Sequence, residues 1–99
     1  MTASRIICEA IRKRLLLEFH YHGKRRVVAP YCHGVSNRGI EVLRAVQIRG
    51  ETGSGKLRIG KLWALGEIVS LRLLEEPFAA NDPTYNPNDS AMKQIHCRV

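Results

Sequence analysis

The residues with the most varied chemistry are four histidines and three cysteines, whose ring nitrogens and sulfurs can bind a metal or act as a base or a nucleophile. Two Cys/His pairs, Cys32-His33 and His96-Cys97, would form a tetrahedral metal site if the fold brought them together. Adjacent residues do not readily bind one metal, and the usual spacer of roughly two to four residues is absent. We therefore predict no metal site and no cofactor.

A thiol nucleophile is the second chemistry to consider, since Cys8 or Cys32 with a nearby histidine could form a nucleophile–base pair. The sequence supplies no third residue to orient the base and no oxyanion donor, so we predict that the protein is not an enzyme. An odd number of cysteines in a chain without an apolar signal region is typical of free thiols in a reducing cytosol. This pattern predicts a cytoplasmic protein.

A phosphate-binding string, G-x-x-x-x-G-K, runs from Gly50 to Lys56. In a P-loop this string opens a helix and is followed by Ser or Thr, which binds magnesium. Here Leu57 follows, and the next residues alternate as they do in a strand. The string is therefore predicted to be a glycine-rich hairpin loop.

The net charge of +7 is unevenly distributed along the chain. Residues 1–61 contain 13 Lys and Arg against 4 Asp and Glu, whereas residues 62–99 contain 3 against 5. A basic half favours an anionic partner such as a nucleic acid or a nucleotide. Surfaces that bind single strands add exposed aromatic rings, so Tyr21, Tyr31 and Trp63 are either stacking platforms or core residues.

The predicted binding site consists of basic, histidine and aromatic side chains of this half. Arg44 lies among apolar neighbours, where an unpaired charge is costly. Its side chain therefore reaches the surface, pairs with an internal carboxylate or meets an anion. We predict that the ligand contacts Tyr21, Arg26, His33, Arg38, Arg44 and Lys61. No apolar run is long enough to cross a membrane.

The elements that must position these residues are a helix and a series of short strands. Residues 5–14 have apolar positions at i, i+3 and i+4 spacing after a candidate N-cap at Ser4. Residues 15–21 alternate as a half-buried strand, and the glycine turn after them begins a return strand. In that return strand Pro30 marks an edge or a bend. Further strands are expected over residues 40–49, 57–63 and 68–74.

The last quarter of the chain differs in composition. Residues 75–91 contain three prolines among Asn and Asp, which is typical of a loop. Residues 92–99 alternate and are predicted to add a strand to an edge, of this domain or of a second subunit. We predict one α+β domain over residues 1–99, with a capping helix at 1–14 and a five-stranded SH3-like or Sm-like β-barrel at 15–74.

The stretch from the helix to the fifth strand resembles the WYL domain of bacteria. In that family a strand ends in Tyr, a turn follows, and the return strand carries Arg-x-x-x-Pro. Tyr21 and the segment from Arg26 to Pro30 match this order. The name-giving Trp-Tyr-Leu-x-Ala strand corresponds to residues 41–45 (EVLRA), and the closing segment corresponds to residues 63–68.

The resemblance implies an Sm-type SH3 barrel and a regulatory, ligand-sensing role toward nucleic acid or nucleotide-like molecules. WYL domains usually follow a DNA-binding helix-turn-helix, so this chain would be a stand-alone copy. The resemblance also implies that Arg26 contacts the ligand, whereas both arginines of the closing segment are replaced, by Ala64 and Glu67. The leading prediction is a non-catalytic module for an anionic ligand. The alternative is a protein-interaction or dimerisation module that uses the C-terminal strand and the Pro-rich loop.

Overall fold

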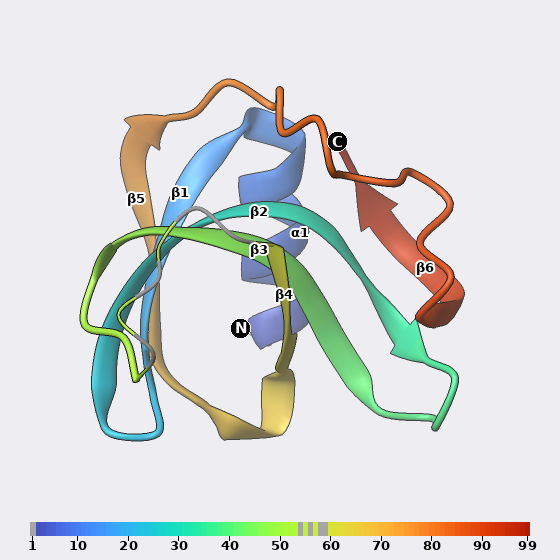
Figure 1. The fold of residues 1–99 in the computed structure, drawn as a ribbon, viewed down its shortest axis with the longest axis horizontal. Coiled ribbons are helices and arrows are strands. Elements are labelled where there is room, and N and C mark those ends of the chain that lie inside the picture. Colours follow the sequence, from blue (N-terminus) through green and yellow to red (C-terminus); the bar gives the residue numbers. More distant parts are fainter. Residues whose placement is uncertain (1, 54, 56, 58–59) are drawn as a thin grey trace.

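The computed structural model describes residues 2–53, 55, 57 and 60–99. This part of the chain forms one α-helix and a six-stranded antiparallel sheet, which confirms the predicted α+β class (Figure 1). In chain order the elements are α1 (Ala3–Lys13), β1 (Leu15–Tyr21), β2 (Lys24–Ser36), β3 (Glu41–Gly50), β4 (Gly60–Ala64), the 3-10 turn η1 (Leu65–Glu67), β5 (Ile68–Pro77) and β6 (Met92–Arg98).

Helix α1 begins at Ala3, two residues earlier than predicted. Its N-cap is Thr2, whose hydroxyl accepts a hydrogen bond from the Arg5 backbone N–H at 3.3 Å. Ser4, the predicted cap, lies in the first turn and its hydroxyl contacts His33 instead. The buried stripe that packs on the sheet consists of Ile7, Ala10 and Ile11. No helix of the described residues is long and apolar enough to cross a membrane.

The sheet has the strand order β4-β3-β2-β1-β5, and β6 pairs with β2 beside this path. The turn between β1 and β2 is formed by His22 and Gly23, which have φ values of 53° and 74°, as a type I′ hairpin requires. After β4, η1 turns the chain so that β5 pairs with β1. Across the described residues no ladder joins β4 to β5. The sheet therefore curves but is not closed, and the predicted barrel closure is not seen.

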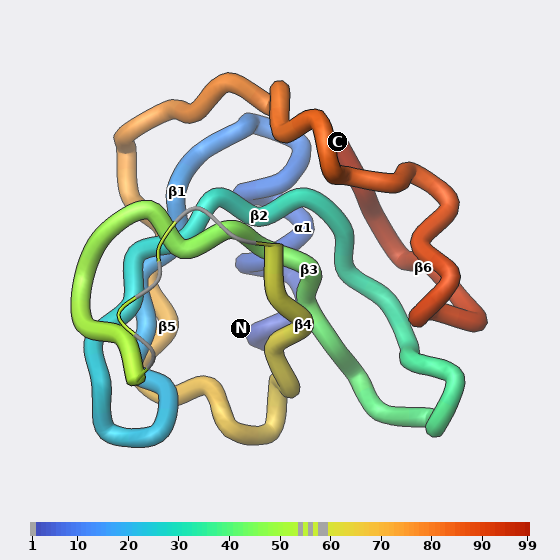
Figure 2. Tube along the Cα trace, in the orientation of Figure 1, coloured from blue at the N-terminus to red at the C-terminus, as the bar shows by residue number. Residues whose placement is uncertain are grey.

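Strand β2 pairs with two strands in succession along one of its edges. Residues 24–28 pair with β1, and residues 32–36 pair with β6 (Figure 2). Pro30 lies between these ladders, at the change of neighbour, so its missing N–H costs no bond to either strand. Gly34 permits the close approach of β6, because a Cβ there would overlap the carbonyl oxygen of Gln94.

The two faces of the sheet are covered by different segments. The core beneath α1 is formed by Leu17, Phe19, Val28, Leu43, Ala45 and Trp63. The opposite face is formed by Leu16, Val27, Ala29, Tyr31 and Val46, and Phe78 and Tyr85 of the loop after β5 pack against it. The Tyr31 hydroxyl accepts a hydrogen bond from the Asp82 backbone N–H at 3.1 Å, which anchors this loop. The alternation predicted for β1, β2 and β3 is confirmed by this division.

A disulfide joins Cys8 of α1 to Cys97 of β6, across a sequence separation of 89 residues. The prediction of three free thiols is therefore wrong for two of them, and Cys32 alone is free. An odd cysteine count does not reveal a pairing that depends on the last strand returning to the first helix. The free thiols no longer support the predicted cytoplasmic location, because structural disulfides persist mainly in oxidising compartments.

The phosphate-loop string lies in the connection between β3 and β4. These two strands are antiparallel, with Val42 opposite Ala64 and Val46 opposite Gly60, which confirms the predicted hairpin arrangement. Residues 54, 56, 58 and 59 of this connection, and with them the start of the strand predicted at residue 57, lie outside the described residues. The next described element is strand β4, whereas a P-loop would open a helix.

Candidate functional site

Arg26, the residue implied most directly by the WYL resemblance, points into the protein. Its side chain is only 6% exposed, and its guanidinium donates to the Gln47 side-chain oxygen and to the Tyr21 carbonyl, both at 3.2 Å. The guanidinium carbon also lies 5.5 Å from the centre of the Trp63 ring, within cation–π range. These contacts tie β1, β2 and β3 together and do not present Arg26 to a ligand at the surface.

Arg44 pairs with an internal carboxylate, one of the three possibilities that the sequence left open. It donates to both carboxylate oxygens of Asp89, at 2.7 and 3.2 Å. This hydrogen-bonded pair lowers the pKa of Asp89, against the opposing effect of the carboxylate's burial. Both residues line a cavity of about 260 Å³ between β3 and the loop after β5. Asp89 was missed because nothing local marks one acid in a Pro/Asn-rich loop as the partner of a strand arginine.

The aromatic residues divide between core and surface. Trp63 is 2% exposed and Tyr31 is 4% exposed, so both are core residues and not stacking platforms. Tyr21 is half-buried, and its ring meets the Trp63 ring edge-on at 4.9 Å between centroids. The Tyr21 hydroxyl accepts a hydrogen bond from the Ala64 backbone N–H at 3.1 Å. Lys61 lies over Trp63, with its Nζ 5.8 Å from the ring centre.

Two of the predicted residues, Tyr21 and Arg38, share an open groove of about 470 Å³, which we call the Tyr21–Arg38 groove. Two of its apolar side chains are unusually exposed, Ile40 at 46% and Leu62 at 37%. The Arg38 guanidinium makes no hydrogen bond or ion pair with any described residue. The groove is lined by Tyr21, Ser36, Asn37, Arg38, Ile40, Val42, Leu62, Ala64 and Ala91.

His33 lies on β2, outside the groove, and is fully buried between α1, β3 and β6. Its Nδ1 is 2.8 Å from the Val42 carbonyl oxygen, which can only accept, so Nδ1 carries the proton. In the neutral ring Nε2 is then an acceptor, and it receives the Ser4 hydroxyl at 2.8 Å. Burial lowers the pKa of His33, although the hydrogen bond to Val42 opposes this effect.

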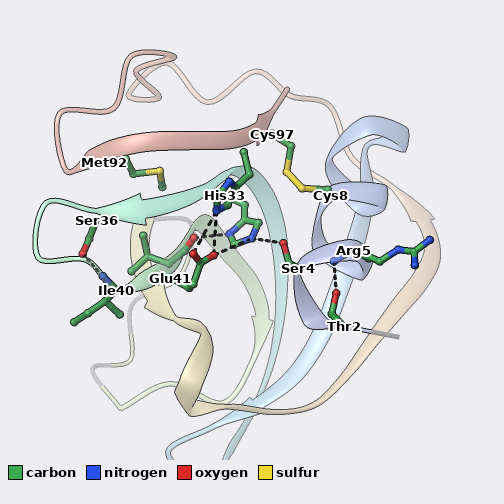
Figure 3. Close-up of polar contacts among 12 residues, drawn as sticks. Thr2, Ser4, Arg5, Cys8, His33, Ser36, Ile40, Glu41, Met92 and Cys97 are labelled. Carbon is green, nitrogen blue, oxygen red and sulfur yellow. Dashed lines mark hydrogen bonds and ion pairs between the residues drawn. A yellow bond between two sulfur atoms is a disulfide. The ribbon is translucent and has the colours of Figure 1, made fainter.

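Two partly exposed side chains, Glu41 and His96, lie beside the buried His33. The Nε2 atom of His96 lies 3.2 and 3.3 Å from the two carboxylate oxygens of Glu41, and one of these oxygens lies 3.7 Å from His33 Nε2. Figure 3 shows Ser4, His33 and Glu41 converging from α1, β2 and β3 beside the disulfide. We call His33, Glu41 and His96 the histidine cluster. Sequence reasoning considered both histidines but paired them with cysteines, and it missed Glu41 as their partner.

The cysteines next to these histidines in sequence, Cys32 and Cys97, make other contacts. Cys97 is bonded to Cys8, and the Cys32 thiol contacts the Met92 sulfur at 3.6 Å in the interior. Burial raises the pKa of the Cys32 thiol, which disfavours the reactive thiolate. Neither of the two Cys/His pairs considered as metal ligands therefore supplies sulfur, and neither Cys8 nor Cys32 presents a nucleophile.

The structure does not gather the six predicted contact residues into one site: Tyr21 and Arg38 share the groove, and Tyr21, Arg26 and Lys61 all contact Trp63. Arg26 and Lys61 are held against Trp63, Arg44 is held by Asp89, and His33 belongs to the histidine cluster. Comparison of the chain with family models, with curated proteins and with solved structures gave no match. The WYL resemblance therefore stays a prediction.

Proposed function

We propose that this domain is a non-catalytic module that binds an anionic, nucleotide-like ligand or a single-stranded nucleic acid in the Tyr21–Arg38 groove. The observation that carries the proposal is the combination of an exposed apolar floor with a cation that no described residue neutralises. Ile40 and Leu62 supply the floor, and Arg38 supplies the charge. A groove volume of about 470 Å³ lies within the range of small-ligand pockets.

The chemistry of such a ligand matches the two parts of the groove. A base has a flat apolar face that can lie on Ile40 and Leu62 beside the Tyr21 ring, whereas a phosphate can accept from the Arg38 guanidinium. The net charge of +7 adds a long-range attraction for anions that acts before contact. The same groove therefore combines an apolar contact with the face of a base and an electrostatic contact with a phosphate.

The order of the helix and strands in the sheet supports this proposal. The strand path β4-β3-β2-β1-β5, with a 3-10 turn between β4 and β5 and a helix before β1, is the order expected of an SH3-like or Sm-like domain. We therefore propose that the sheet is an open version of this architecture. A WYL-like role in regulation by ligand binding is consistent with a groove in place of a deep catalytic cleft.

The test is a fluorescence titration of labelled single-stranded RNA and DNA at two salt concentrations. Binding should weaken with added salt, because phosphate contacts release counterions. Arg38→Gln should weaken binding and lower the salt dependence by about one counterion. Arg12→Gln is the matched control, because Arg12 is an exposed arginine on α1 outside the groove. No binding at low salt, or an equal loss in both variants, would contradict the proposal.

The alternative of a protein-interaction module has one observation in its favour, which is the exposure of Ile40 and Leu62. The version that used the C-terminal strand is less direct, because β6 already pairs with β2 of its own chain along one edge. Light scattering of the full chain measures the competing outcome. A dimer that Leu62→Ser converts to a monomer would favour protein association at the groove over nucleic acid.

A further inference from the structure

The histidine cluster gathers three different donors around one point. His33 Nε2, one carboxylate oxygen of Glu41 and His96 Nε2 all lie within 4.8 Å of one another. They come from β2, β3 and β6, and are separated in sequence by up to 63 residues. We propose that these three side chains form a binding site for a divalent transition-metal ion, with Zn²⁺ as the preferred occupant.

The distances already approach those of a coordination shell. Ligands that lie about 2.0–2.2 Å from a tetrahedral zinc are about 3.4 Å from one another. The Glu41 oxygen is 3.2 Å from His96 Nε2 and 3.7 Å from His33 Nε2. The two histidine Nε2 atoms lie within 4.8 Å of each other, so the Glu41 and His96 side chains, which are 49% and 30% exposed, must rotate to close the shell around one ion.

The position of His33 meets the usual requirement for an oriented ligand. A histidine that binds metal commonly donates its other ring N–H to a backbone carbonyl or a carboxylate, which fixes the ring and the tautomer. His33 Nδ1 makes such a bond with the Val42 carbonyl at 2.8 Å. The Nε2 lone pair accepts the Ser4 hydroxyl and lies near Glu41, so the ring is oriented before any metal arrives.

The donor set selects among metals. Two imidazole nitrogens and one carboxylate suit zinc and its neighbours in the first transition row, whereas calcium and magnesium prefer shells of oxygen. Two His with one Glu is a set that zinc also uses in proteins, with a fourth position left for water. The Ser4 hydroxyl, 2.8 Å from His33 Nε2, must turn away as the metal takes that lone pair. It would then be placed to hydrogen-bond a metal-bound water.

The surroundings indicate a structural metal more than a catalytic one. Neither the cavity beside Arg44 and Asp89 nor the Tyr21–Arg38 groove is lined by His33, Glu41 or His96. The metal would join β6 to β2 and β3 at a point close to the Cys8–Cys97 disulfide (Figure 3). The two links would act on the same part of the molecule, since His96 and Cys97 are adjacent in β6.

The test is calorimetric titration of the full-length, oxidised protein with ZnCl₂, without reductant or chelator. We expect one ion per chain and a rise in melting temperature with zinc, because the unfolded chain lacks the assembled site. His96→Gln and Glu41→Gln should each lower the affinity by at least about tenfold. Both side chains are partly exposed, so these variants should fold without metal.

The matched control is His22→Gln. His22 and Glu67 form an exposed imidazole–carboxylate pair at 2.6 Å, but no third ligand accompanies them among the described residues. Its loss should leave the affinity unchanged. Titration with Co²⁺ should give ligand-field bands of a four- or five-coordinate ion, without a thiolate charge-transfer band, and Cys32→Ala should give the same spectrum. Absence of stoichiometric binding, or an equal loss in His22→Gln and His96→Gln, would overturn the proposal.

Discussion

Arg26 and His33 lie on the same strand with buried side chains, yet their surroundings differ. The Arg26 guanidinium donates to an amide oxygen and a backbone carbonyl and lies against an aromatic ring, all of them neutral groups of the interior. His33 has one backbone partner, and its other nitrogen faces a hydroxyl and a carboxylate near the surface. Arg26 and His33 are therefore both buried, but only His33 lies beside a partly exposed carboxylate, that of Glu41, which a ligand could reach.

The two ends of β2 differ also in covalent support. Only the His33 end is next to a disulfide, which closes a loop of about 90 residues. In the chain-entropy description, a loop of this length contributes about 4.6 kcal/mol. The double variant Cys8→Ser/Cys97→Ser should lose about this free energy of unfolding, measured by urea denaturation without reductant. Wild-type protein unfolded without reductant should expose one thiol, that of Cys32. Three reactive thiols, or no difference in stability, would show that the bond does not form.

Removal of the Arg26 side chain tests the end of β2 that pairs with β1. Arg26→Met leaves the Gln47 side-chain oxygen and the Tyr21 carbonyl without their buried donors. We expect a loss of about 2–3 kcal/mol in the free energy of unfolding. Arg12→Gln, on the exposed side of α1, should change stability by less than about 0.5 kcal/mol. If Arg26→Met were as stable as wild type but no longer bound RNA, Arg26 would be a ligand residue after all.

The approach of β6 to the His33 end depends on a single glycine. Gly34→Ala places a Cβ against the Gln94 carbonyl oxygen, so β6 must move away from β2. We expect a loss of about 1–3 kcal/mol, as for other overpacked sites. Zinc affinity should fall as well, because His96 belongs to the displaced strand. Gly53→Ala is the control, since a Cβ there meets nothing within 4 Å. Unchanged zinc binding in Gly34→Ala would show that His96 of β6 is not a zinc ligand.

Arg44 has a charged partner, Asp89, whereas the partners of Arg26 are neutral. The stability of variants at the two positions should therefore depend differently on pH. The pKa of Asp89 is lowered from its ordinary value of 3.8, mainly by the hydrogen bonds with Arg44. The ionised carboxylate therefore stabilises the folded state when the pH is above 3.8. This contribution disappears as the pH falls below 3.8 through the lowered pKa. Arg44→Met should cost about 1–2 kcal/mol at pH 7 and flatten this acid dependence. Arg26→Met should leave the acid dependence in place, because the Arg26 partners do not titrate. Unfolding by urea at pH 7 and at pH 3 measures both variants.

Much of the fold could be predicted from local patterns. Alternating residues such as Leu17 and Phe19 in β1, and Leu43 and Ala45 in β3, do occupy the core face, because side chains of a strand alternate between its two sides. The order of the helix and the strands along the chain was also predicted from these local patterns. The ends of the elements were predicted less accurately. Ser4 was predicted to cap the helix because serine is a good cap, but its hydroxyl bonds to the distant His33, and Thr2 is the cap.

Much less of the candidate site could be predicted. Basic residues were assigned to ligand contact by their charge, but Arg26 and Arg44 have internal partners that lie 21 and 45 residues away in sequence. Of the assigned residues, Arg38 still combines exposure with a guanidinium that no described residue pairs. Glu41 could have been suspected, since it begins a strand opposite the end of β2, but no local pattern indicates that a histidine from the last strand will meet it.

The sequence by itself determined the α+β class, the strand faces, the His22-Gly23 turn and the excess of positive charge, because each depends on residues near one another along the chain. The tertiary structure decided which polar groups meet. Where β2 exchanges β1 for β6 near Pro30, the last strand returns to the first helix, and this one change of neighbour joins Cys8 to Cys97 and places His96 beside His33 and Glu41. Pairings over such separations depend on the path of the whole chain, which the spacing of residues along it does not record.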